Sequence, residues 1–222
     1  MEKIIVIGGK GSAIVVGEQI CDANQKGANV EFLGFAFDDE SFGSEIAGFP
    51  VVSKTKEVFN KFKDYSDVKF IYQLYRPDLM RERIDLLNSY RIPLDRYATF
   101  IHPSVVISKN SKIGRGTAIM ANSVINSNAI IGNHCTIHSN SLIGHDTLMG
   151  NYNFIAAHNV IGSNNVIGNA NFLGLNSSFN NYIEIGDFCF VGMASNVIKS
   201  VNSDTKVYGN PAKEFIKDIK PL

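Results

Sequence analysis

The 222-residue sequence has no tryptophan and no surplus of either charge. Its 21 Lys and Arg residues are balanced by 21 Asp and Glu residues, so the chain as a whole has no electrostatic attraction to nucleic acid or to an anionic membrane. We therefore expect no nucleic-acid partner, although the balanced net charge does not exclude binding through a local basic patch. The lack of tryptophan decides nothing about function.

Cysteines and long apolar runs are also scarce. Cys21, Cys135 and Cys189 are widely spaced and include no CxxC pair. This pattern favours a reducing, cytoplasmic setting and argues against disulfides and a zinc site. No apolar run approaches the length of a membrane span, and residues 1–3 lead directly into a short apolar run. We therefore expect a cytoplasmic protein with no signal peptide and no membrane insertion.

A six-residue repeat runs from Ile101 to Val197, and every sixth residue in it is large and apolar. Eleven of the first twelve are Ile, with Met149 as the exception, and the last five are Leu173, Phe179, Ile185, Val191 and Val197. Glycine often follows the apolar residue, and a small polar residue often lies two positions before it. A helix repeats near 3.6 residues and a strand near two, so period six indicates a parallel β-helix.

The repeat also predicts the dimensions of the coil. Three hexapeptides make one triangular turn, so the repeats give about five to six turns stacked ~4.8 Å apart and a coil about 25–30 Å tall. The repeating apolar residue points inward, and Gly and Asn at the corners adopt positive φ. Phe154, Phe172 and Phe190 point outward, which predicts either packing against other copies or support for the C-terminal segment.

Strands and helices alternate before the repeat begins. The strand pattern covers 3–7, 30–35 and 69–74, and the helix pattern ends near residue 26 and then covers 55–63 and 78–90. This alternation predicts an α/β domain with a parallel sheet over residues 1–97. The β-helix domain and its C-terminal tail then cover residues 98–222.

A glycine turn joins the first predicted strand to the first helix: Gly8, Gly9, Lys10, Gly11 and Ser12. Backbone N–H groups of such a turn and the positive end of the helix form an anion site. Asp38 and Asp39 end the second strand, where nucleotide-binding sheets contact ribose or base. However, the turn lacks the full GxGxxG fingerprint, so the residues alone favour an ordinary turn over a dinucleotide site. The length of the segment fits a mononucleotide half-fold better.

All histidines lie in the repeat region: His102, His134, His138, His145 and His158. Asp146 follows His145, and a carboxylate beside an imidazole orients it and makes it more basic. On the residues alone, a catalytic role and a role as an ordinary surface residue are equally supported for His145. His134 and His138 are four residues apart, which in a β-helix places them on different faces, so we expect no metal site.

Segments in order along the whole chain carry a resemblance, among them residues 4–12, 34–39, 48–51, 101–104, Gly144–Asp146, 172–177 and Val207–Lys213. The chain resembles the sugar acetyltransferases of the left-handed β-helix class. It is most similar to sugar-nucleotide N-acetyltransferases with a Rossmann-like N-terminal domain, and to sialic acid O-acetyltransferases. The resemblance implies a nucleotide-sugar-binding Rossmann-like domain, an all-β left-handed parallel β-helix, and a homotrimer with active sites between subunits.

The resemblance also implies roles for particular residues. His145 is the expected general base and Asp146 its acidic partner, in direct transfer from acetyl-CoA to a sugar amine. A backbone N–H near Ser163 of the next subunit is expected to stabilise the oxyanion. The implied acetyl-CoA site comprises Ser163, Leu175, Gly192, Met193, Gly209, Asn210 and Lys213. The implied nucleotide-sugar site comprises Gly9, Lys10, Gly11, Ser12, Asp38, Asp39 and Arg76.

Several residues depart from the family pattern. Ser12 stands where the family usually has His, His138 where Asn is common, and Phe154 where a second His is usual. Gly144 replaces a frequent Glu, and Arg76 lies near the position of a usual Gly. The implied activity is N-acetylation of a nucleotide-linked 4-amino-4,6-dideoxyhexose for surface-glycan biosynthesis, with acetyl-CoA as co-substrate and no metal.

Other functions stay open on the sequence alone. One is O-acetylation of sialic acid or of another sugar hydroxyl. A metal-dependent lyase of the β-helix carbonic-anhydrase kind requires three converging histidines. A non-catalytic assembly or nucleotide-sensing protein is disfavoured by the His145–Asp146 pair and by residues 209–213. The nucleotide (UDP, GDP or dTDP), the sugar and the acyl group also stay open.

Overall fold

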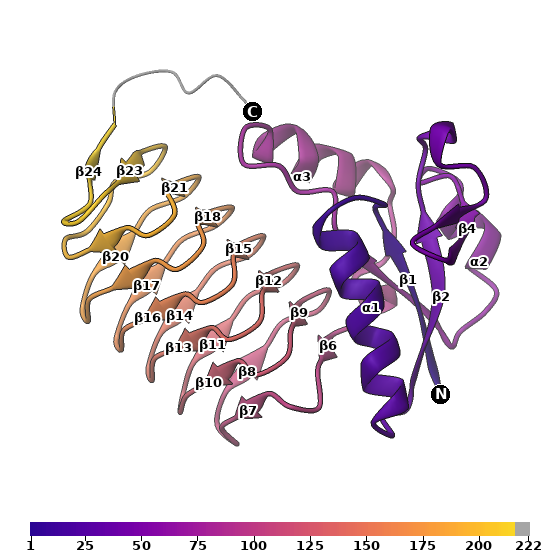
Figure 1. Ribbon diagram of the computed structural model, residues 1–222, viewed down its shortest axis with the longest axis horizontal. Coiled ribbons are helices and arrows are strands. Elements are labelled where there is room, and N and C mark those ends of the chain that lie inside the picture. Colours follow the sequence, from indigo (N-terminus) through magenta and orange to yellow (C-terminus); the bar gives the residue numbers. More distant parts are fainter. Residues whose placement is uncertain (216–222) are drawn as a thin grey trace.

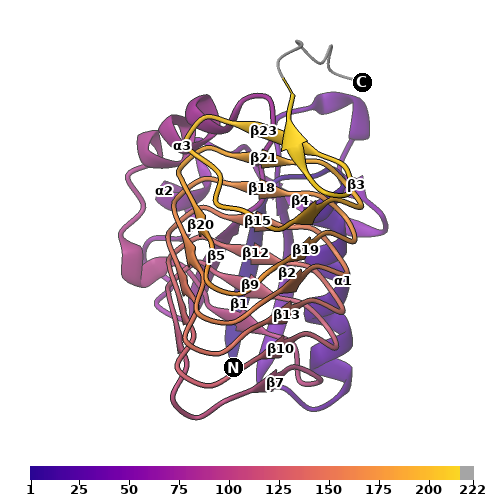
Figure 2. The same ribbon diagram turned by 90° about the vertical axis from the view of Figure 1, so that its left-hand side faces the viewer.

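A computed structural model of the chain describes residues 1–215. An α/β N-terminal part and a coil of very short strands lie side by side along the long axis of the molecule (Figure 1). The coil forms the larger part, and its turns stack one on another (Figure 2).

The N-terminal part is built on a five-stranded sheet with strand order β3-β4-β2-β1-β5. Its strands are β1 (Glu2–Ile7), β2 (Val30–Ala36), β3 (Glu45–Ile46), β4 (Phe49–Ser53) and β5 (Val68–Tyr72). Its helices are α1 (Ser12–Gln25), α2 (Val58–Phe62) and α3 (Met80–Ser89), with 3-10 turns at Glu40–Phe42 and Leu94–Arg96. The apolar run of β1 forms an interior strand between β2 and β5, and its residues Ile4–Ile7 are fully buried, as a strand covered on both faces requires.

The three predicted strands are confirmed, but the hairpin of β3 and β4 was not predicted. These two strands pair antiparallel, while the other pairs of the sheet are parallel. The turn between them uses Ala47 and Gly48 at φ 51° and 78°, without the Asn-Gly signature that marks such turns in a sequence. The sheet is mixed, and the helices that pack on it are few and in part short. The Rossmann-like arrangement expected from the sequence is therefore not confirmed.

From β6 to β22 the coil consists of two-residue strands that each pair in parallel with the strand 18 residues away, which forms three faces. At the C-terminal end, the three-residue β23 pairs in parallel with β21 at a spacing of 16 residues, and β24 pairs antiparallel with β23. The first face holds β6 (Phe100–Ile101), β9 (Ala118–Ile119), β12 (Thr136–Ile137), β15 (Phe154–Ile155), β18 (Phe172–Leu173), β21 (Phe190–Val191), β23 (Lys206–Tyr208) and β24 (Lys213–Glu214). The second face holds β7 (Val106–Ile107), β10 (Val124–Ile125), β13 (Leu142–Ile143), β16 (Val160–Ile161), β19 (Ser178–Phe179) and β22 (Asn196–Val197). The third face holds β8 (Lys112–Ile113), β11 (Ile130–Ile131), β14 (Leu148–Met149), β17 (Val166–Ile167) and β20 (Glu184–Ile185). This parallel arrangement confirms the expected β-helix.

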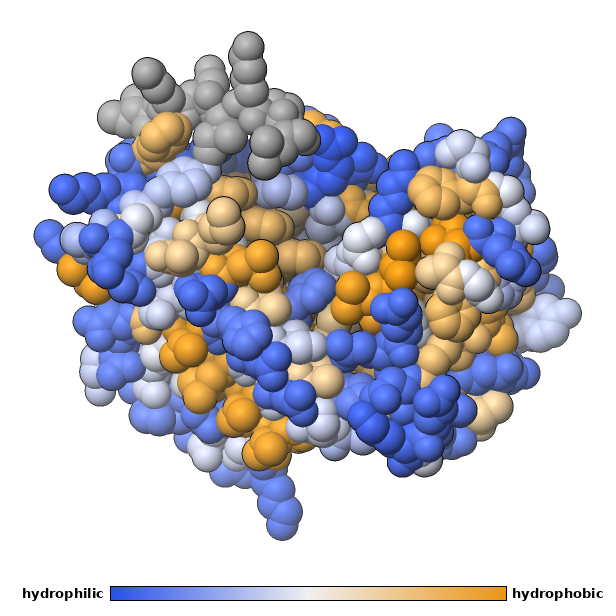
Figure 3. All heavy atoms as spheres, viewed as in Figure 1, coloured by the Kyte–Doolittle hydropathy of each residue, from blue (hydrophilic) through white to orange (hydrophobic). Residues whose placement is uncertain are grey.

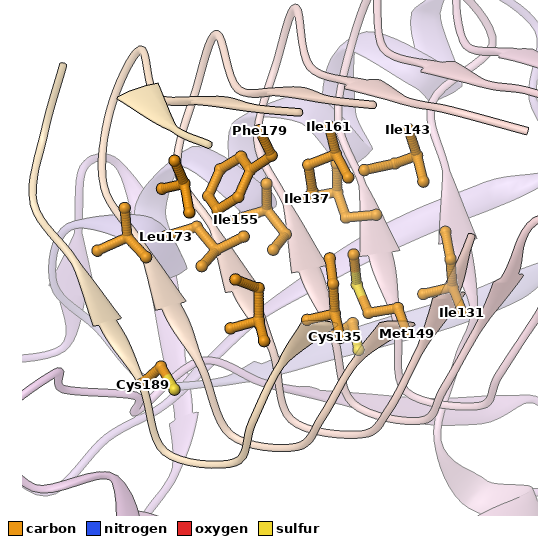
Figure 4. Close-up of a cluster of buried hydrophobic side chains, with 14 of the residues drawn as sticks. Ile131, Cys135, Ile137, Ile143, Met149, Ile155, Ile161, Leu173, Phe179 and Cys189 are labelled. Atoms are coloured by element: carbon orange, nitrogen blue, oxygen red, sulfur yellow. The ribbon is translucent and has the colours of Figure 1, made fainter. Parts of the chain in front are cut away.

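The repeating apolar residue points into the coil, as the period predicts. From Ile119 onward these residues are nearly or fully buried and form one cluster (Figure 4). The inward residue of each turn therefore stacks on that of the next turn, and each buried Ile contributes roughly 1.5–3 kcal/mol before entropy is subtracted.

At most corners, glycine does not take the positive φ that was expected of it. Positive φ falls three positions after the inward residue, and from Asn122 to Ala194 none of these residues is glycine. The glycine directly after the inward residue has another role. A Cβ on Gly144 would lie 2.4 Å from the carbonyl oxygen of Gly162 in the next turn, so close stacking of turns requires glycine there. Asp146 is one of the corner residues, at φ 57°.

The N-terminal part packs on the first face of the coil. Helix α1 shares a buried cluster with Phe100 and Ala118. Gln19 of α1 donates a hydrogen bond to Ser139 Oγ (2.9 Å) at the corner between the first and second faces. Arg81 of α3 pairs with Asp204 at the corner between the third and first faces. The N-terminal part therefore packs on the first face between two corners, and among residues 1–215 none of its side-chain hydrogen bonds reaches the corner between the second and third faces.

The outward aromatic residues of the first face form a ladder. The rings of Phe154, Phe172 and Phe190 stack with centroids 5.0 and 5.3 Å apart. The stack continues to Tyr208 and then to Phe215. The ladder thus supports the C-terminal segment, which was one of the two interpretations of these residues.

Candidate functional site

The His145–Asp146 pair lies at the corner between the second and third faces, directly after β13. His145 Nδ1 is 2.6 Å from Asp146 Oδ2, and Asp146 also accepts a hydrogen bond from Asn128 Nδ2 (2.9 Å) in the preceding turn. Hydrogen bonds from His145 and then Asn128 hold the pKa of Asp146 below its ordinary value, so the carboxylate is ionised at neutral pH.

An ionised carboxylate accepts hydrogen bonds only, so the proton of the neutral imidazole lies on Nδ1. The opposite nitrogen, Nε2, is then an acceptor, and it has no hydrogen-bond partner among residues 1–215. The His145 side chain is 54% exposed. A carboxylate that holds Nδ1–H in this way orients the imidazole and leaves Nε2 as an acceptor, which is the geometry that a general base requires.

Ser163 lies one turn after His145 in the same corner. Its backbone N–H already donates a hydrogen bond to Asn181 Oδ1 at 2.7 Å. The expected role of this N–H as an oxyanion donor therefore requires that a ligand displace the Asn181 side chain. The predicted turn of three hexapeptides places Asn181 directly above Ser163, but the sequence analysis did not identify the hydrogen bond between them.

The predicted acetyl-CoA residues gather near the last turns of the coil. Leu175 and Met193 lie one turn apart at the corner between the first and second faces, and both are exposed. The ring of Tyr208 covers Gly192, and Gly209 N–H donates to Ser195 Oγ (3.1 Å). Asn210 and Lys213 follow in the final turn. The second face separates the Leu175–Met193 corner from the His145 corner.

The predicted anion loop joins β1 to α1 at the carboxyl edge of the sheet. Gly11 takes φ 52°, and a Cβ on Gly9 would lie 2.6 Å from the ring of Phe37. The first turn of α1 carries no acidic residue and no side-chain cap, so its positive end stays available for an anion. Lys10 Nζ lies 2.8 Å from Asp39 Oδ2. Hydrogen bonds from Lys10 and from Ser41 lower the pKa of Asp39 to about 2.

Three of the predicted nucleotide-sugar residues have their side chains engaged within the chain. Asp38 accepts hydrogen bonds from the Thr55 N–H (2.8 Å) and hydroxyl (2.6 Å). Arg76 pairs with Asp78 at 2.7 Å. Ser12 donates to the side chain of Gln73 (2.9 Å). Lys10 and Asp39 are also engaged, with each other, so a ligand that binds at the loop must exchange this exposed ion pair.

His138 is a residue of this region that the sequence did not place. Its Nε2 is 3.0 Å from Ser12 Oγ, and Gln73 Nε2 donates to Thr136 Oγ1 (2.8 Å). Burial lowers the pKa of His138 to about 4, so the imidazole is neutral at pH 7. Ser12 and His138, two of the residues that depart from the family pattern, thus contact each other across the junction of the N-terminal part and the coil.

Two cavities lie in the N-terminal part and at the junction. A cavity of about 260 Å³ lies at the carboxyl ends of β2 and β4, lined by Phe37, Asp39, Glu40, Gly43, Val51, Val52, Ser53 and Lys54. A cavity of about 190 Å³ lies between α3 and the coil, lined by Leu87, Asn88, Ile92, Leu94, Tyr97, His134 and Tyr152. The first adjoins the Lys10–Asp39 pair, since Asp39 belongs to both.

Histidines do not gather into a metal-ligand set. Within residues 1–215, no three His, Cys, Asp or Glu side chains come together as ligands for one ion. His134 lies instead against Tyr97 and Tyr152 at the corner between the third and first faces, where burial lowers its pKa to about 4. Separately, none of the helices that the structure describes has the length and apolarity of a membrane span.

The two halves of the candidate site do not meet within one chain. The anion loop lies beside the first face of the coil, where Ser12 contacts His138. His145 lies at the corner between the second and third faces, opposite the first face. No side-chain hydrogen bond or ion pair joins the anion loop to His145 within residues 1–215.

Comparison with known proteins supports the class of the fold. Residues 110–145 and 128–163 match the family model described as bacterial transferase hexapeptide (six repeats). No curated protein matches the sequence. The coil is therefore a hexapeptide-repeat coil of the kind found in bacterial transferases.

Several solved structures share the fold of this chain. One is a His-to-Asn variant of perosamine N-acetyltransferase from Caulobacter crescentus in complex with CoA and GDP-perosamine, with 23% identity, TM-score 0.80 and 98% of each chain covered. Another is the acetyltransferase domain of PglB from Neisseria gonorrhoeae FA1090 in complex with acetyl coenzyme A, with 21% identity, TM-score 0.80, and 96% of this chain and 99% of that chain covered. A third is WeeI from Acinetobacter baumannii AYE, with 22% identity, TM-score 0.76, and 97% and 100% covered. The resemblance seen in the sequence is thus confirmed for the fold of nearly the whole chain.

Proposed function

We propose that the protein is an acetyl-CoA-dependent N-acetyltransferase acting on a nucleotide-linked amino sugar. The observation that carries the proposal is the His145–Asp146 pair, which presents an oriented basic nitrogen on an exposed corner of a hexapeptide coil. The likeness to structures that hold CoA with GDP-perosamine, or acetyl coenzyme A, supports the same reaction class.

The reaction is a direct transfer. The sugar amine attacks the thioester carbonyl, a C–N bond forms, and the C–S bond breaks to release CoA as a thiolate. His145 Nε2 takes the proton that the amine nitrogen loses and returns it to the thiolate. Asp146 stabilises the resulting imidazolium through Nδ1–H, at the 2.6 Å contact already present. An N–H group such as that of Ser163 stabilises the oxyanion, once Asn181 has released it.

The active form is a homotrimer with active sites between subunits. Apolar side chains lie exposed on both faces that flank the His145 corner, with Val106 and Val160 on the second face, and Ile130, Leu148 and Val166 on the third. Figure 3 shows hydrophobic residues in a row along the surface of the coil. Such rows favour burial against another copy, which brings His145 of one subunit to the anion loop of its neighbour.

Each substrate has a proposed position. Acetyl-CoA lies along the second face, where Leu175 and Met193 offer apolar contact to the pantetheine arm and Lys213 offers charge to the phosphates. The sugar nucleotide lies on the loop of Gly9–Ser12, with its diphosphate at Lys10 and the positive end of α1. The acceptor in this proposal is a 4-amino-4,6-dideoxyhexose of surface-glycan biosynthesis, and a cytoplasmic location agrees with three free cysteines.

The test is release of the CoA thiol from acetyl-CoA in the presence of nucleotide-linked amino sugars and their hydroxyl analogues. We expect turnover with the amino sugars. His145→Ala should lower it by about 10²–10⁴-fold, the usual contribution of a general base. Lys63→Ala, at an exposed residue of the N-terminal part, is the control and should keep its activity. Wild-type turnover in His145→Ala would refute the base, and turnover only with hydroxyl analogues would favour O-acetylation.

A further inference from the structure

The cavity at the carboxyl ends of β2 and β4 continues the predicted anion site in one direction. The ring of Phe37 contacts Gly9 of the loop and also lines the cavity. Asp39 pairs with Lys10 on one side and lines the cavity on the other. Moving away from the loop, a bound ligand therefore meets a phosphate site, then a carboxylate suited to ribose hydroxyls, and then the cavity.

Glu40 and Lys54 form the polar rim of this cavity. Glu40 Oε1 is 2.8 Å from Lys54 Nζ, and the two side chains are 81% and 55% exposed. An ion pair this exposed contributes little to folding. The pair therefore has no strong structural role, and a ligand that satisfies both charges can replace it at little cost.

From these contacts we propose that the cavity binds the guanine base of the sugar nucleotide, with Glu40 and Lys54 as the residues that select it. This inference rests on the proposed function, because it assumes a nucleoside-diphosphate-linked acceptor. The other walls suit a base, since Phe37, Val51 and Val52 offer aromatic and apolar surface to its faces.

The pairing of donors and acceptors selects guanine over the other bases. An ionised carboxylate has two acceptor oxygens and no donor, while a lysine ammonium has donors only. Guanine presents two adjacent donors, N1–H and the N2 amino group, followed by the O6 acceptor. Glu40 can therefore accept from both donors while Lys54 donates to O6.

Other bases leave a mismatch at the carboxylate. Uracil and thymine present one N–H between two carbonyl oxygens, so one Glu40 oxygen would face a carbonyl oxygen. Adenine and cytosine present one amino group beside an acceptor nitrogen, with the same result. A mismatch of this kind typically costs about fivefold to 150-fold in affinity.

The experiment is calorimetric titration of the full-length protein with GDP, UDP, dTDP, CDP and ADP. We expect GDP to bind about fivefold to 150-fold more tightly than each of the others. Glu40→Gln should remove most of this preference and improve UDP and dTDP relative to GDP, because a side-chain amide offers one donor and one acceptor. Lys54→Met should weaken GDP selectively. Glu82→Gln, at an exposed carboxylate of α3, is the matched control.

The outcomes separate this inference from the proposed function. Equal affinity for all five nucleotides, or an unchanged GDP preference in Glu40→Gln, overturns the guanine site while acetyl transfer to other sugar nucleotides stands. If no nucleoside diphosphate binds and no sugar nucleotide is acetylated, both fail. If none binds but nucleotide-free amino sugars are acetylated, the guanine site fails, and the catalytic pair survives with a different acceptor.

Discussion

The His145 corner and the anion loop present their polar groups in different ways. At the corner, the left-handed conformation of Asp146 and the pitch of the coil fix the carboxylate against His145 and Asn128 before any ligand arrives. At the loop, Lys10 is paired with Asp39, and Glu40 with Lys54, on an exposed surface. The polar groups of the corner are thus fixed in advance, whereas a ligand at the loop must exchange existing ion pairs.

The difference also concerns rigidity. The coil repeats one packing unit, so every turn supports the next. A destabilising substitution in its core therefore affects the corners of the neighbouring turns as well. The N-terminal site depends instead on single contacts, such as Ser12 with His138, which form only when the two parts dock. Substitutions in each region test whether the two behave as independently as this contrast implies.

The largest expected effect is loss of the coil itself. Ile137→Asp places a charge in a fully buried position. The free-energy cost of burying an unpaired charge exceeds the free energy of unfolding of a typical domain. We expect no soluble folded protein in the cell lysate or after refolding. The control is Ile137→Val, with an expected loss of about 0.5–1.5 kcal/mol in the free energy of unfolding. A soluble Ile137→Asp protein with native circular dichroism would contradict the inward register.

The next effect concerns the faces beside the His145 corner. Leu148→Arg adds a charge to a side chain that is 47% exposed in the monomer and, in our proposal, buried in the trimer. Light scattering should show monomers, and acetyl transfer should fall to background because the two halves of the site no longer meet. Tyr65→Arg, on the exposed surface of the N-terminal part, should remain trimeric. A trimeric, active Leu148→Arg protein would place the interface elsewhere.

A smaller effect is expected from Asp146→Asn, which removes the charge that holds Nδ1–H of His145. A hydrogen bond to a charged group contributes about 1.5–3 kcal/mol, which corresponds to a loss of roughly tenfold to hundredfold in kcat. The loss should appear in kcat more than in KM, since the pair acts on the proton and not on binding. An unchanged kcat would show that Asp146 has no role in catalysis and serves only the conformation of the corner.

The last effect is confined to acid pH and is a loss of stability at the junction. His134 and His138 have pKa values lowered to about 4 by burial, against an ordinary value of 6.5. The unfolded chain therefore binds protons first, and stability present above pH 6.5 is lost as the pH falls from about 6.5 to 4. Thermal unfolding should show Tm falling across this window, with a shallower fall in His134→Phe. An equally steep fall in that variant would assign the effect to other groups.

Much of the coil could be predicted from the sequence because its contacts are repeats. Period six placed the inward residues, and the adjacency of His145 and Asp146 placed the pair. The contacts that were missed join distant positions. Ser163 N–H meets Asn181 through the pitch of the coil, and Ser12 meets His138 through the docking of the two parts. The predicted 18-residue turn places the first two residues side by side without showing their hydrogen bond, and the second contact has no signature in the sequence.

The central claim is that one subunit supplies His145 and its neighbour supplies the anion loop. It is tested most directly by mixing His145→Ala and Lys10→Glu subunits, each inactive alone in our account, by co-expression or by joint refolding. Mixed trimers then contain one site with both wild-type residues, so we predict that acetyl transfer returns well above that of either variant. If the mixed trimers form and stay as inactive as the separate variants, the two halves act within a single chain, and the composite site is wrong.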